Sequence, residues 1–265
     1  MHMEIEIDYT KSAQDNADLY YKKAKKILLK TEGAKHAISD LKKQLEEAKE
    51  NKRKEEIVNA RKTKIITKRE WYENFHWFFT SNGLLAIGGR DAGQNELINS
   101  KYFTDNDLFF HANIFGASFV VLKDGLNADK SIKEEVAQFA GSYSSAWKEG
   151  LSTIDVYSAK RSQVSKSTSK GSLGRGSFLI SGEREWYNVP LKLVFFVKDE
   201  KLNVVPEYTF VKILPINKLK YVTINVGREK KSDVAKKIFE FLEIDINEII
   251  RNLPNGTFKV ELKES

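Results

Sequence analysis

Apolar and small residues near the start of the chain recur at alternating steps of four and three positions. The series comprises Ala13, Ala17, Tyr20, Ala24, Ile27, Thr31, Ala34, Ile38, Leu41, Leu45 and Ala48. This spacing predicts a helix with a coiled-coil seam, and the lysines and glutamates between these positions are typical of its solvated faces. Ser12 is a candidate N-cap for this helix.

The predicted helix is weak by itself. Its many alanines bury little area each, and Gly33 costs about 1 kcal/mol in a helix interior. The helix therefore needs a partner, either another chain or a segment upstream, and we expect a homodimer through residues 12–50. A solvated helix without any partner is the alternative. From Asn51 to Arg69 the seam weakens into a basic stretch that either continues or ends the helix.

Beyond Lys68 the chain becomes aromatic and rich in strand-forming residues. After a last helical turn at residues 71–75, strands are expected at 76–80, 84–87, 107–112, 118–122, 153–157, 177–180, 192–197, 207–213 and 221–226. Helices are expected at 92–99, 132–147, 232–242 and 246–252. Because the order shows no regular βαβ rhythm, the expected fold class is α+β: a long N-terminal coiled-coil helix (residues 1–70) followed by a mixed α+β domain (residues 71–265).

Charge and cysteine content narrow the choice of partner. The formal net charge is +7 and the sequence pI is about 9.2, which favours a polyanionic partner such as nucleic acid or, less often, an anionic membrane surface. The chain has no cysteine, so disulfides, thiolate metal sites and a cysteine nucleophile are excluded. No apolar run reaches a membrane span, and Met1-His2-Met3 lacks the features of a signal peptide. We therefore expect a cytoplasmic protein without a membrane partner. The same three residues look like a vector junction, which indicates a fragment of a longer protein.

Residues 160–181 form the strongest candidate for contact with phosphates. This basic loop contains Gln163 and, without any acidic residue, the cations Lys160, Arg161, Lys166, Lys170 and Arg175. Its glycines and serines let backbone N–H groups and hydroxyls approach phosphate oxygens. It is not a Walker motif, because no glycine-lysine-serine step follows a strand at the required spacing. A solvated flexible loop has the same composition, so that alternative stays open.

A second polar cluster follows a pair of glycines at residues 88 and 89. It consists of Arg90, Asp91, Gln94 and Asn95, whose side chains are able to contact phosphate or base edges. An ion pair that shapes a turn is the alternative.

His111 lies at the end of an expected strand, close to Asn113. Structural hydrogen bonding, contact with nucleic acid and catalysis are all open to it. Only His76 and His111 lie in the domain, and no paired carboxylates or Ser/His/Asp pattern appears. We therefore expect no catalytic residue, no metal and no cofactor, and we do not expect an enzyme.

Blocks of this sequence resemble the NFACT family of ribosome quality-control factors, in family order. Residues 9–26 resemble the start of the family's coiled-coil arm, and residues 71–78 and 88–96 the opening of its NFACT-R domain. Further blocks lie at residues 110–118, 140–147, 155–157, 163–166 and 176–180. The resemblance spans about residues 9 to 200, and the tail is similar to a C-terminal extension of archaeal-type members, which would begin at about residue 207.

This resemblance implies a role in the rescue of stalled translation. Family members bind large ribosomal subunits that still carry peptidyl-tRNA and recruit tRNA, so that C-terminal tails are added without mRNA. The implied partners are large-subunit RNA and tRNA, and the implied RNA-binding residues are the polar and basic residues of the turn, the strand end and the loop named above. The family's N-terminal domain, to which tailing is mainly ascribed, has no counterpart here, so this chain should bind RNA but not elongate a tail.

Two departures from the family pattern bear on these residues. Asn113 stands where the family usually has Asp, which lowers the negative charge beside His111. Residues 167–175 omit the family's carboxylate, which makes the loop more basic. Two other functions remain: a general DNA- or RNA-binding module, which would bind duplex DNA equally well, and, less favoured, an RNA-processing enzyme that depends on His111.

Overall fold

The computed structural model describes residues 5–62, 70–168, 171–213 and 219–264, with side chains of the first helix as far as Lys49. Contacts within the chain divide it into two compact units, Met1–Thr67 and Lys68–Ser265. The sequence prediction placed this boundary after residue 70. The first unit is helical and the second mixes helices with strands, which confirms the expected α+β fold class.

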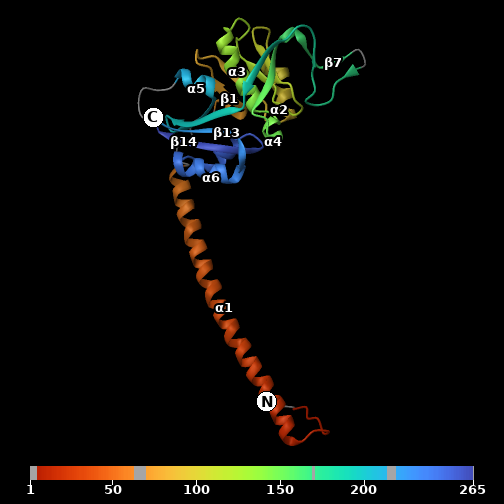
Figure 1. Ribbon diagram of the computed structural model, residues 1–265, viewed down its shortest axis with the longest axis vertical. Coiled ribbons are helices and arrows are strands. Elements are labelled where there is room, and N and C mark those ends of the chain that lie inside the picture. The colour runs from red at the N-terminus through yellow and green to blue at the C-terminus, as the bar shows by residue number, and fades with distance from the viewer. Residues whose placement is uncertain (1–4, 63–69, 169–170, 214–218, 265) are drawn as a thin grey trace. The chain divides into compact units, whose positions relative to one another are not determined.

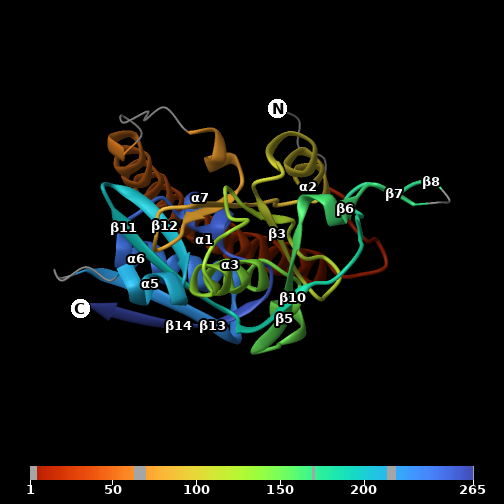
Figure 2. The ribbon, with the colours of Figure 1, turned by 90° about the horizontal axis from the view of Figure 1, so that it is seen from above.

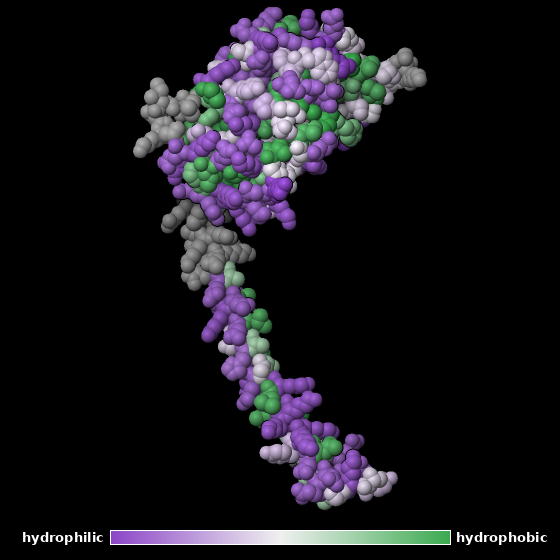
Figure 3. Space-filling model, viewed as in Figure 1, coloured by the Kyte–Doolittle hydropathy of each residue, from purple (hydrophilic) through white to green (hydrophobic). Residues whose placement is uncertain are grey.

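The first unit is built on one long helix, α1 (Ala13–Lys62), which continues through the first part of the basic stretch (Figure 1). Ser12 accepts a hydrogen bond from the backbone N–H of Asp15 at 3.1 Å, so the predicted N-cap is confirmed. Figure 3 shows apolar side chains interspersed with hydrophilic ones along this helix. Four large seam residues are 54–64% exposed, namely Ile27, Ile38, Leu41 and Leu45. The described part of the chain therefore leaves the predicted seam uncovered.

The described residues of the second unit form six α-helices and several short helical turns. The helices are α2 (Ala92–Leu97), α3 (Lys130–Ser142), α4 (Ala146–Glu149), α5 (Glu207–Ile213), α6 (Lys231–Leu242) and α7 (Ile246–Asn252), with the turns η1 (Trp71–Asn74), η2 (Ile98–Tyr102) and η3 (Arg161–Gln163). Within the described ranges, no helix is long and apolar enough to cross a membrane.

Two antiparallel sheets organise the second unit. The first has the order β1 (His76–Phe79), β2 (Leu85–Gly88), β4 (Val120–Leu122), β3 (Leu108–Ala112), β5 (Thr153–Lys160), β10 (Glu185–Pro190). The second has the order β12 (Lys201–Pro206), β11 (Lys192–Lys198), β13 (Lys220–Lys230), β14 (Thr257–Glu264). Two short pairs complete the fold: β6 (Val164–Ser165) with β9 (Leu179–Ile180), and β7 (Ser167–Thr168) with β8 (Gly171–Ser172).

Helix α3 joins the two sheets into one core. It packs against β3, β5 and β10 of the six-stranded sheet and against β11 and β12 of the other sheet, an arrangement that Figure 2 shows from above. This core contains fully buried phenylalanines from both sheets and from α3, namely Phe110, Phe139, Phe195 and Phe258. Because each such side chain contributes about 1.5–3 kcal/mol when buried, the C-terminal segment is an integral part of the fold.

The opposite face of the six-stranded sheet carries a smaller core. Phe109 and Val121 from the strands pack there beneath Phe75, Ile98 and Phe119. This cover reaches only part of the face, since it is built from the segments around η1, η2 and the basic loop. The rest of that face, over β5 and β10, includes exposed side chains.

One expected strand is a helix. Residues 207–213 form α5, although four successive residues, Tyr208-Thr209-Phe210-Val211, favour strands by propensity. Thr209 and Lys212 both reach the same buried carboxylate, that of Glu135. Side chains three positions apart share one face in a helix but lie on opposite faces of a strand, so this shared partner requires the helix.

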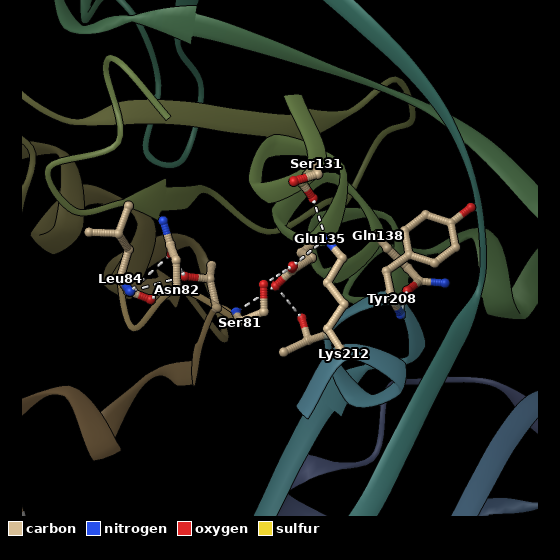
Figure 4. Close-up of polar contacts among 10 residues, drawn as sticks. Ser81, Asn82, Leu84, Ser131, Glu135, Gln138, Tyr208 and Lys212 are labelled. Atoms are coloured by element: carbon tan, nitrogen blue, oxygen red, sulfur yellow. Dashed lines mark hydrogen bonds and ion pairs between the residues drawn. The ribbon is translucent and has the colours of Figure 1, made fainter. Parts of the chain in front are cut away.

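That carboxylate is the centre of a buried polar network (Figure 4). Glu135 of α3 is fully buried and accepts hydrogen bonds from the backbone N–H of Ser81 at 2.8 Å and from its hydroxyl. The Thr209 hydroxyl donates to it at 2.8 Å, and the Lys212 ammonium forms an ion pair at 2.7 Å. The network thereby ties α5 to the turn between β1 and β2.

Other differences from the predicted elements are smaller. The helix expected at 132–147 ends at Ser142 and resumes as α4, and only two residues of the strand expected at 177–180 form β9. Strands β10, β12 and β14 and the two-residue strands β6, β7 and β8 are absent from the predicted elements. In β10, Asn188 and Pro190 lower the strand propensity, and its pairing with β5 supplies what the local sequence does not.

Candidate nucleic-acid interface

Arg90 of the glycine turn is committed to internal contacts. Its guanidinium donates to the backbone carbonyls of Asn74 at 3.2 Å, of Phe75 at 2.8 Å and of Arg251, and to Oδ1 of Asn252 at 3.2 Å. Burial lowers the pKa of Arg90 to about 10, so the group stays charged at neutral pH. The side chain thus connects the residues just before β1 with the C-terminal end of α7.

The other predicted residues of this turn also have structural partners. Asp91 accepts from the backbone N–H of Gln94 at 2.9 Å and so caps α2. Gln94 Oε1 accepts from the backbone N–H of Arg90 at 3.0 Å, and Asn95 Oδ1 from that of Phe119 at 3.1 Å. Asp91 is exposed, while Gln94 and Asn95 are half-buried. These contacts explain why polar residues lie here, and contact with RNA stays a prediction.

Gln163 closes the base of the basic loop. Its Oε1 accepts from the backbone N–H of Lys160 at 2.8 Å, and its Nε2 donates to the carbonyls of Ser181 at 2.9 Å and Glu183 at 2.6 Å. One amide therefore holds both ends of the loop together. The Lys160 side chain next to it is exposed to solvent.

Lys166 forms an ion pair with an acidic residue from outside the basic loop, which has no acidic residue of its own. Glu96 of α2 forms an ion pair with its ammonium group, which also donates to the carbonyls of Gly174 at 2.7 Å and Ser177 at 3.0 Å and lies 4.8 Å from the ring centre of Phe178. The interaction with Lys166 keeps the pKa of Glu96 below its ordinary value despite partial burial. The loop is therefore less positive toward solvent than its sequence indicates.

The remaining cations of the loop differ in their availability. Arg161 is half-buried and lies 5.1 Å from the ring centre of Phe103. Lys160 and Arg175 are exposed, and Lys170 lies outside the described residues. Figures 1 and 2 both show β7 extending away from the two sheets. Lys160 and Arg175 are thus the loop cations that the structure leaves to solvent.

A row of three aromatic side chains crosses the open part of the six-stranded sheet. His111 of β3 pairs with Tyr157 of β5, which pairs with Trp186 of β10. Directly opposed residues project from the same face, here the face opposite α3. Ring centres are 5.8 Å apart for His111 and Tyr157 and 5.3 Å apart for Tyr157 and Trp186. Trp186 is 51% exposed, and the Arg184 guanidinium lies 4.6 Å from the Tyr157 ring centre.

A polar row lies next to the aromatic row on the same face. Asp155 pairs with Asn188, whose Nδ2 donates to Oδ1 of Asp155 at 2.7 Å, and the backbone N–H of Asn113 donates to the Asp155 carbonyl at 2.8 Å. All three side chains are exposed. We refer to the aromatic row, the polar row and Arg184 together as the sheet-face site. It includes two predicted residues, His111 and Asn113.

The sequence pattern does not point to the other members of the sheet-face site, because it does not predict β10 as a strand. A signal was present: Trp186 and Asn188 are two positions apart, as are Asp155 and Tyr157, which is the period of side chains on one face of a strand. Recognising it requires the pairing of β5 with β10, which local sequence does not reveal.

The electrostatics of His111 suit binding better than acid–base chemistry. Burial lowers its pKa to about 4, and the charge of Arg184 acts in the same direction. At neutral pH the imidazole is therefore uncharged, and its pKa lies well below the value near 7 that favours a general base. Among the described residues, no group of three or more His, Asp or Glu side chains is arranged to hold a metal ion.

Comparison with known proteins gives consistent matches. Residues 74–182 match the model of the NFACT protein RNA binding domain. The archaeal Rqc2 homolog aRqcH of Methanocaldococcus jannaschii is 40% identical over 212 residues, which cover 76% of this chain and 31% of that protein. The ribosome quality control complex subunit NEMF homolog of Drosophila melanogaster is 34% identical over 206 residues, covering 74% and 20%. This chain thus spans about a third or less of the length of these relatives.

A solved structure also matches, more distantly. It is the C-terminal part of the fibronectin/fibrinogen-binding protein from Streptococcus suis, which is 21% identical, with a TM-score of 0.39 over 67% of this chain and 76% of that one.

Proposed function

Because this chain belongs to the NFACT family, we propose that it is the RNA-binding part of a ribosome quality-control factor that acts in the cytoplasm. In this proposal it binds stalled large ribosomal subunits that carry peptidyl-tRNA, contacts large-subunit RNA and tRNA, and supports tRNA recruitment for C-terminal tailing. Residues 71–265 are the RNA-binding domain, with the extension from about 207, and residues 1–70 are the coiled-coil arm. The description of the matching family model and the names of the relatives support this role.

The observation that carries RNA binding is the sheet-face site. Proteins that recognise single-stranded RNA on a sheet stack unpaired bases on exposed aromatic rings and hydrogen-bond the base edges. Here Trp186 supplies an exposed ring, Arg184 a cation over the neighbouring ring of Tyr157, and Asn113 and Asn188 exposed amides. We infer that unpaired bases bind this site.

The predicted residues of the turn and loop divide into two roles in this proposal. Lys160, Arg175 and Lys170 contact phosphates, while the half-buried members, Arg90, Gln94, Asn95, Arg161, Gln163 and Lys166, mainly hold the surface in shape. For the described residues this division follows from their contacts, since a cation already paired with a carboxylate or carbonyl contributes less to phosphate binding. Asp91, which caps α2, belongs with the second group, and Lys170 is assigned by its charge alone.

A general nucleic-acid-binding module is the second candidate, supported by the net charge of +7. Phosphate contacts alone do not distinguish RNA from duplex DNA, whereas base stacking requires unpaired bases. Preference between these two ligands therefore separates the two functions.

The test is a fluorescence anisotropy titration of the chain with tRNA, a large-subunit RNA fragment, unpaired RNA and duplex DNA at two salt concentrations. We expect unpaired RNA to bind more tightly than duplex DNA, and all binding to weaken with salt. Trp186→Ala should weaken binding to unpaired RNA about 5- to 100-fold, in line with a loss of about 1–3 kcal/mol per stacked base, and Trp186→Phe should retain most of it.

Phe79→Ala is the matched control, because Phe79 is an aromatic residue 42% exposed on β1, the opposite edge of the same sheet. Equal loss in both variants would remove the sheet-face site from the proposal. Equal affinity for duplex DNA and unpaired RNA would favour the general module.

A further inference from the structure

Three cations meet where α7 ends near the start of β1. They are Arg90 of the glycine turn, Lys231 at the first position of α6 and Arg251 in the last turn of α7. Arg90 and Arg251 both donate to the carbonyl of Asn74, Arg90 also donates to the carbonyl of Arg251, and Lys231 donates to the carbonyl of Leu253, two residues further along the chain. These shared acceptors place the three cations together. We refer to Arg90, Lys231 and Arg251 as the cation cluster.

No carboxylate forms an ion pair with the cation cluster within the described ranges. None of the ion pairs found there involves Arg90, Lys231 or Arg251. Burial lowers the pKa of Lys231, and the neighbouring charge of Arg90 lowers it further. Burial likewise lowers the pKa of Arg90, and the charge of Arg251 adds to this effect. The fold thus holds like charges together at a cost that an anion would offset.

A stacked pair of rings lies next to the cation cluster. The ring of His76 stacks on that of Tyr143 with 3.7 Å between centres, and the Tyr143 hydroxyl donates to the carbonyl of Asn252 at 3.0 Å. The Nδ1 atom of His76 is buried and has no hydrogen-bond partner in the structure as described. A buried polar atom without a partner is unusual and is compatible with a ligand or water at that point.

Donors remain free on the solvent side. Arg251 is exposed and donates only Nη2 to the carbonyl of Asn74, at 3.3 Å, in the described structure. Lys231 is half-buried and donates to the carbonyl of Leu253 at 2.7 Å. Because an arginine has five N–H donors and a lysine three, both keep donors for a ligand.

Capping of α7 explains only part of this arrangement. Arg90 donates to the carbonyl of Arg251 and Lys231 to that of Leu253, so both stabilise the carbonyl end of the helix. The negative end of a helix corresponds to about half a unit charge, and it is smaller for a helix as short as α7. Three cations exceed what such a helix end requires.

We infer that the cation cluster binds a phosphate group, with Arg251 and Lys231 as its direct donors and Arg90 as the residue that positions them. In the RNA complex of the proposed function this would be a backbone phosphate, and this assignment rests on that proposal. The alternative source of the same chemistry is free phosphate or a small phosphorylated ligand.

The cluster and the sheet-face site are separate. His76 and Glu185 lie in one cross-strand row from β1 to β10, five strand spacings or roughly 24 Å apart. His76 projects toward α3, whereas the aromatic row projects from the other face. An RNA that contacts both sites must therefore pass around the edge of the sheet, which an unpaired segment is able to do.

The test is a titration of the 265-residue chain with inorganic phosphate, with ionic strength held constant by chloride, followed through the side-chain signals of the arginines by NMR. We expect a saturable shift of the Arg90 and Arg251 signals. Arg251→Gln and Lys231→Gln should each weaken phosphate binding at least tenfold. Lys236→Gln, which changes an exposed lysine on the same helix α6, should leave it unchanged.

A parallel tRNA titration identifies the source of the phosphate. If RNA supplies it, Arg251→Gln should weaken tRNA binding about fivefold and reduce the salt slope by roughly one. Saturable phosphate binding with unchanged tRNA affinity would assign the site to a free phosphate compound. Drift without saturation, equal in wild type and variants, would overturn the site and leave only the helix cap.

The titration with inorganic phosphate is independent of the proposed function. Trp186→Ala should not alter the phosphate titration. A chain that binds phosphate at the cluster but no RNA would end the proposed function and leave this site intact.

Discussion

At the scale of single residues, the histidine of the sheet-face site makes stability depend on pH. The pKa of His111 is about 4 in the folded chain and about 6.5 in an unfolded one. Between these values the unfolded state binds more protons, so the free energy of unfolding rises with pH, and this contribution is lost as pH falls from about 6.5 toward 4.

Replacing His111 by Gln should remove that contribution. Between pH 7 and pH 5 the wild-type chain should lose about 1–2 kcal/mol more stability than His111→Gln, measured by urea unfolding at both pH values. His76, whose pKa burial also lowers, acts in the same direction in both proteins and cancels in the difference. Parallel pH dependences would show that His111 titrates normally.

Glu135 should be among the most sensitive positions for stability. The variant Glu135→Gln keeps the shape but leaves Lys212 without its counter-charge and places an amide N–H₂ among donors. We expect a loss of about 2–4 kcal/mol in urea unfolding, somewhat less than for a fully buried pair because Lys212 is partly exposed. Glu134→Gln, one position along α3 and outside this network, should change stability by about 0.5 kcal/mol or less. A similar loss in both variants would contradict this account.

Residue types were easier to predict from the sequence than residue partners. The sequence marks Lys166 as a cation of the basic loop and Arg90 as a cation of the glycine turn, but the partners of both come from distant segments. Glu96 lies 70 positions before Lys166, and Asn252 lies 162 positions after Arg90. No local pattern reports such pairs, so a loop without acidic residues looked more available to phosphate than it is.

At the scale of elements, patterns predicted well where one face is buried and failed where tertiary contacts decide. Helix α6 has apolar residues at helical spacing and lies at the predicted position, and the β1–β2 hairpin follows its predicted turn. Helix α5 and strand β10 are the reverse case, because a buried carboxylate and a neighbouring strand override their local propensities.

Whether the exposed seam of helix α1 pairs with a second copy of the chain is open to a direct test. If the exposed seam of α1 pairs with a second copy, the chain should run as a dimer in light scattering. Leu41→Lys with Leu45→Lys should return it to a monomer, because charges replace two seam residues. Lys42→Gln with Lys43→Gln, between the seam positions, is the control. A monomeric wild-type chain would contradict self-pairing, and would leave either a partner segment of another protein or of a longer chain, or a solvated helix without a partner.

At the scale of the whole molecule, the family match is shorter than the unit that folds. The match ends at residue 182, before β10 and before the second sheet, whose Phe195 and Phe258 share the main core. The two sheets meet on α3, so residues 74–182 lack one side of that core.

A chain of residues 74–182 should therefore not fold by itself. We expect it to show no cooperative thermal unfolding by circular dichroism and poorly dispersed NMR spectra, whereas residues 70–265 should unfold cooperatively. A well-dispersed spectrum of the short chain would show that the second sheet is an independent addition.

In concentrated solution, strand β10 is able to pair with a strand of another molecule. In the described part of the chain β10 is the last strand of its sheet and pairs only with β5, and a groove of about 770 Å³ lies among residues of α3, β10 and α5. Open edges are templates for aggregation, and here only Pro190 and the polar Glu185 and Asn188 protect the edge. Colloidal stability should therefore depend on this strand.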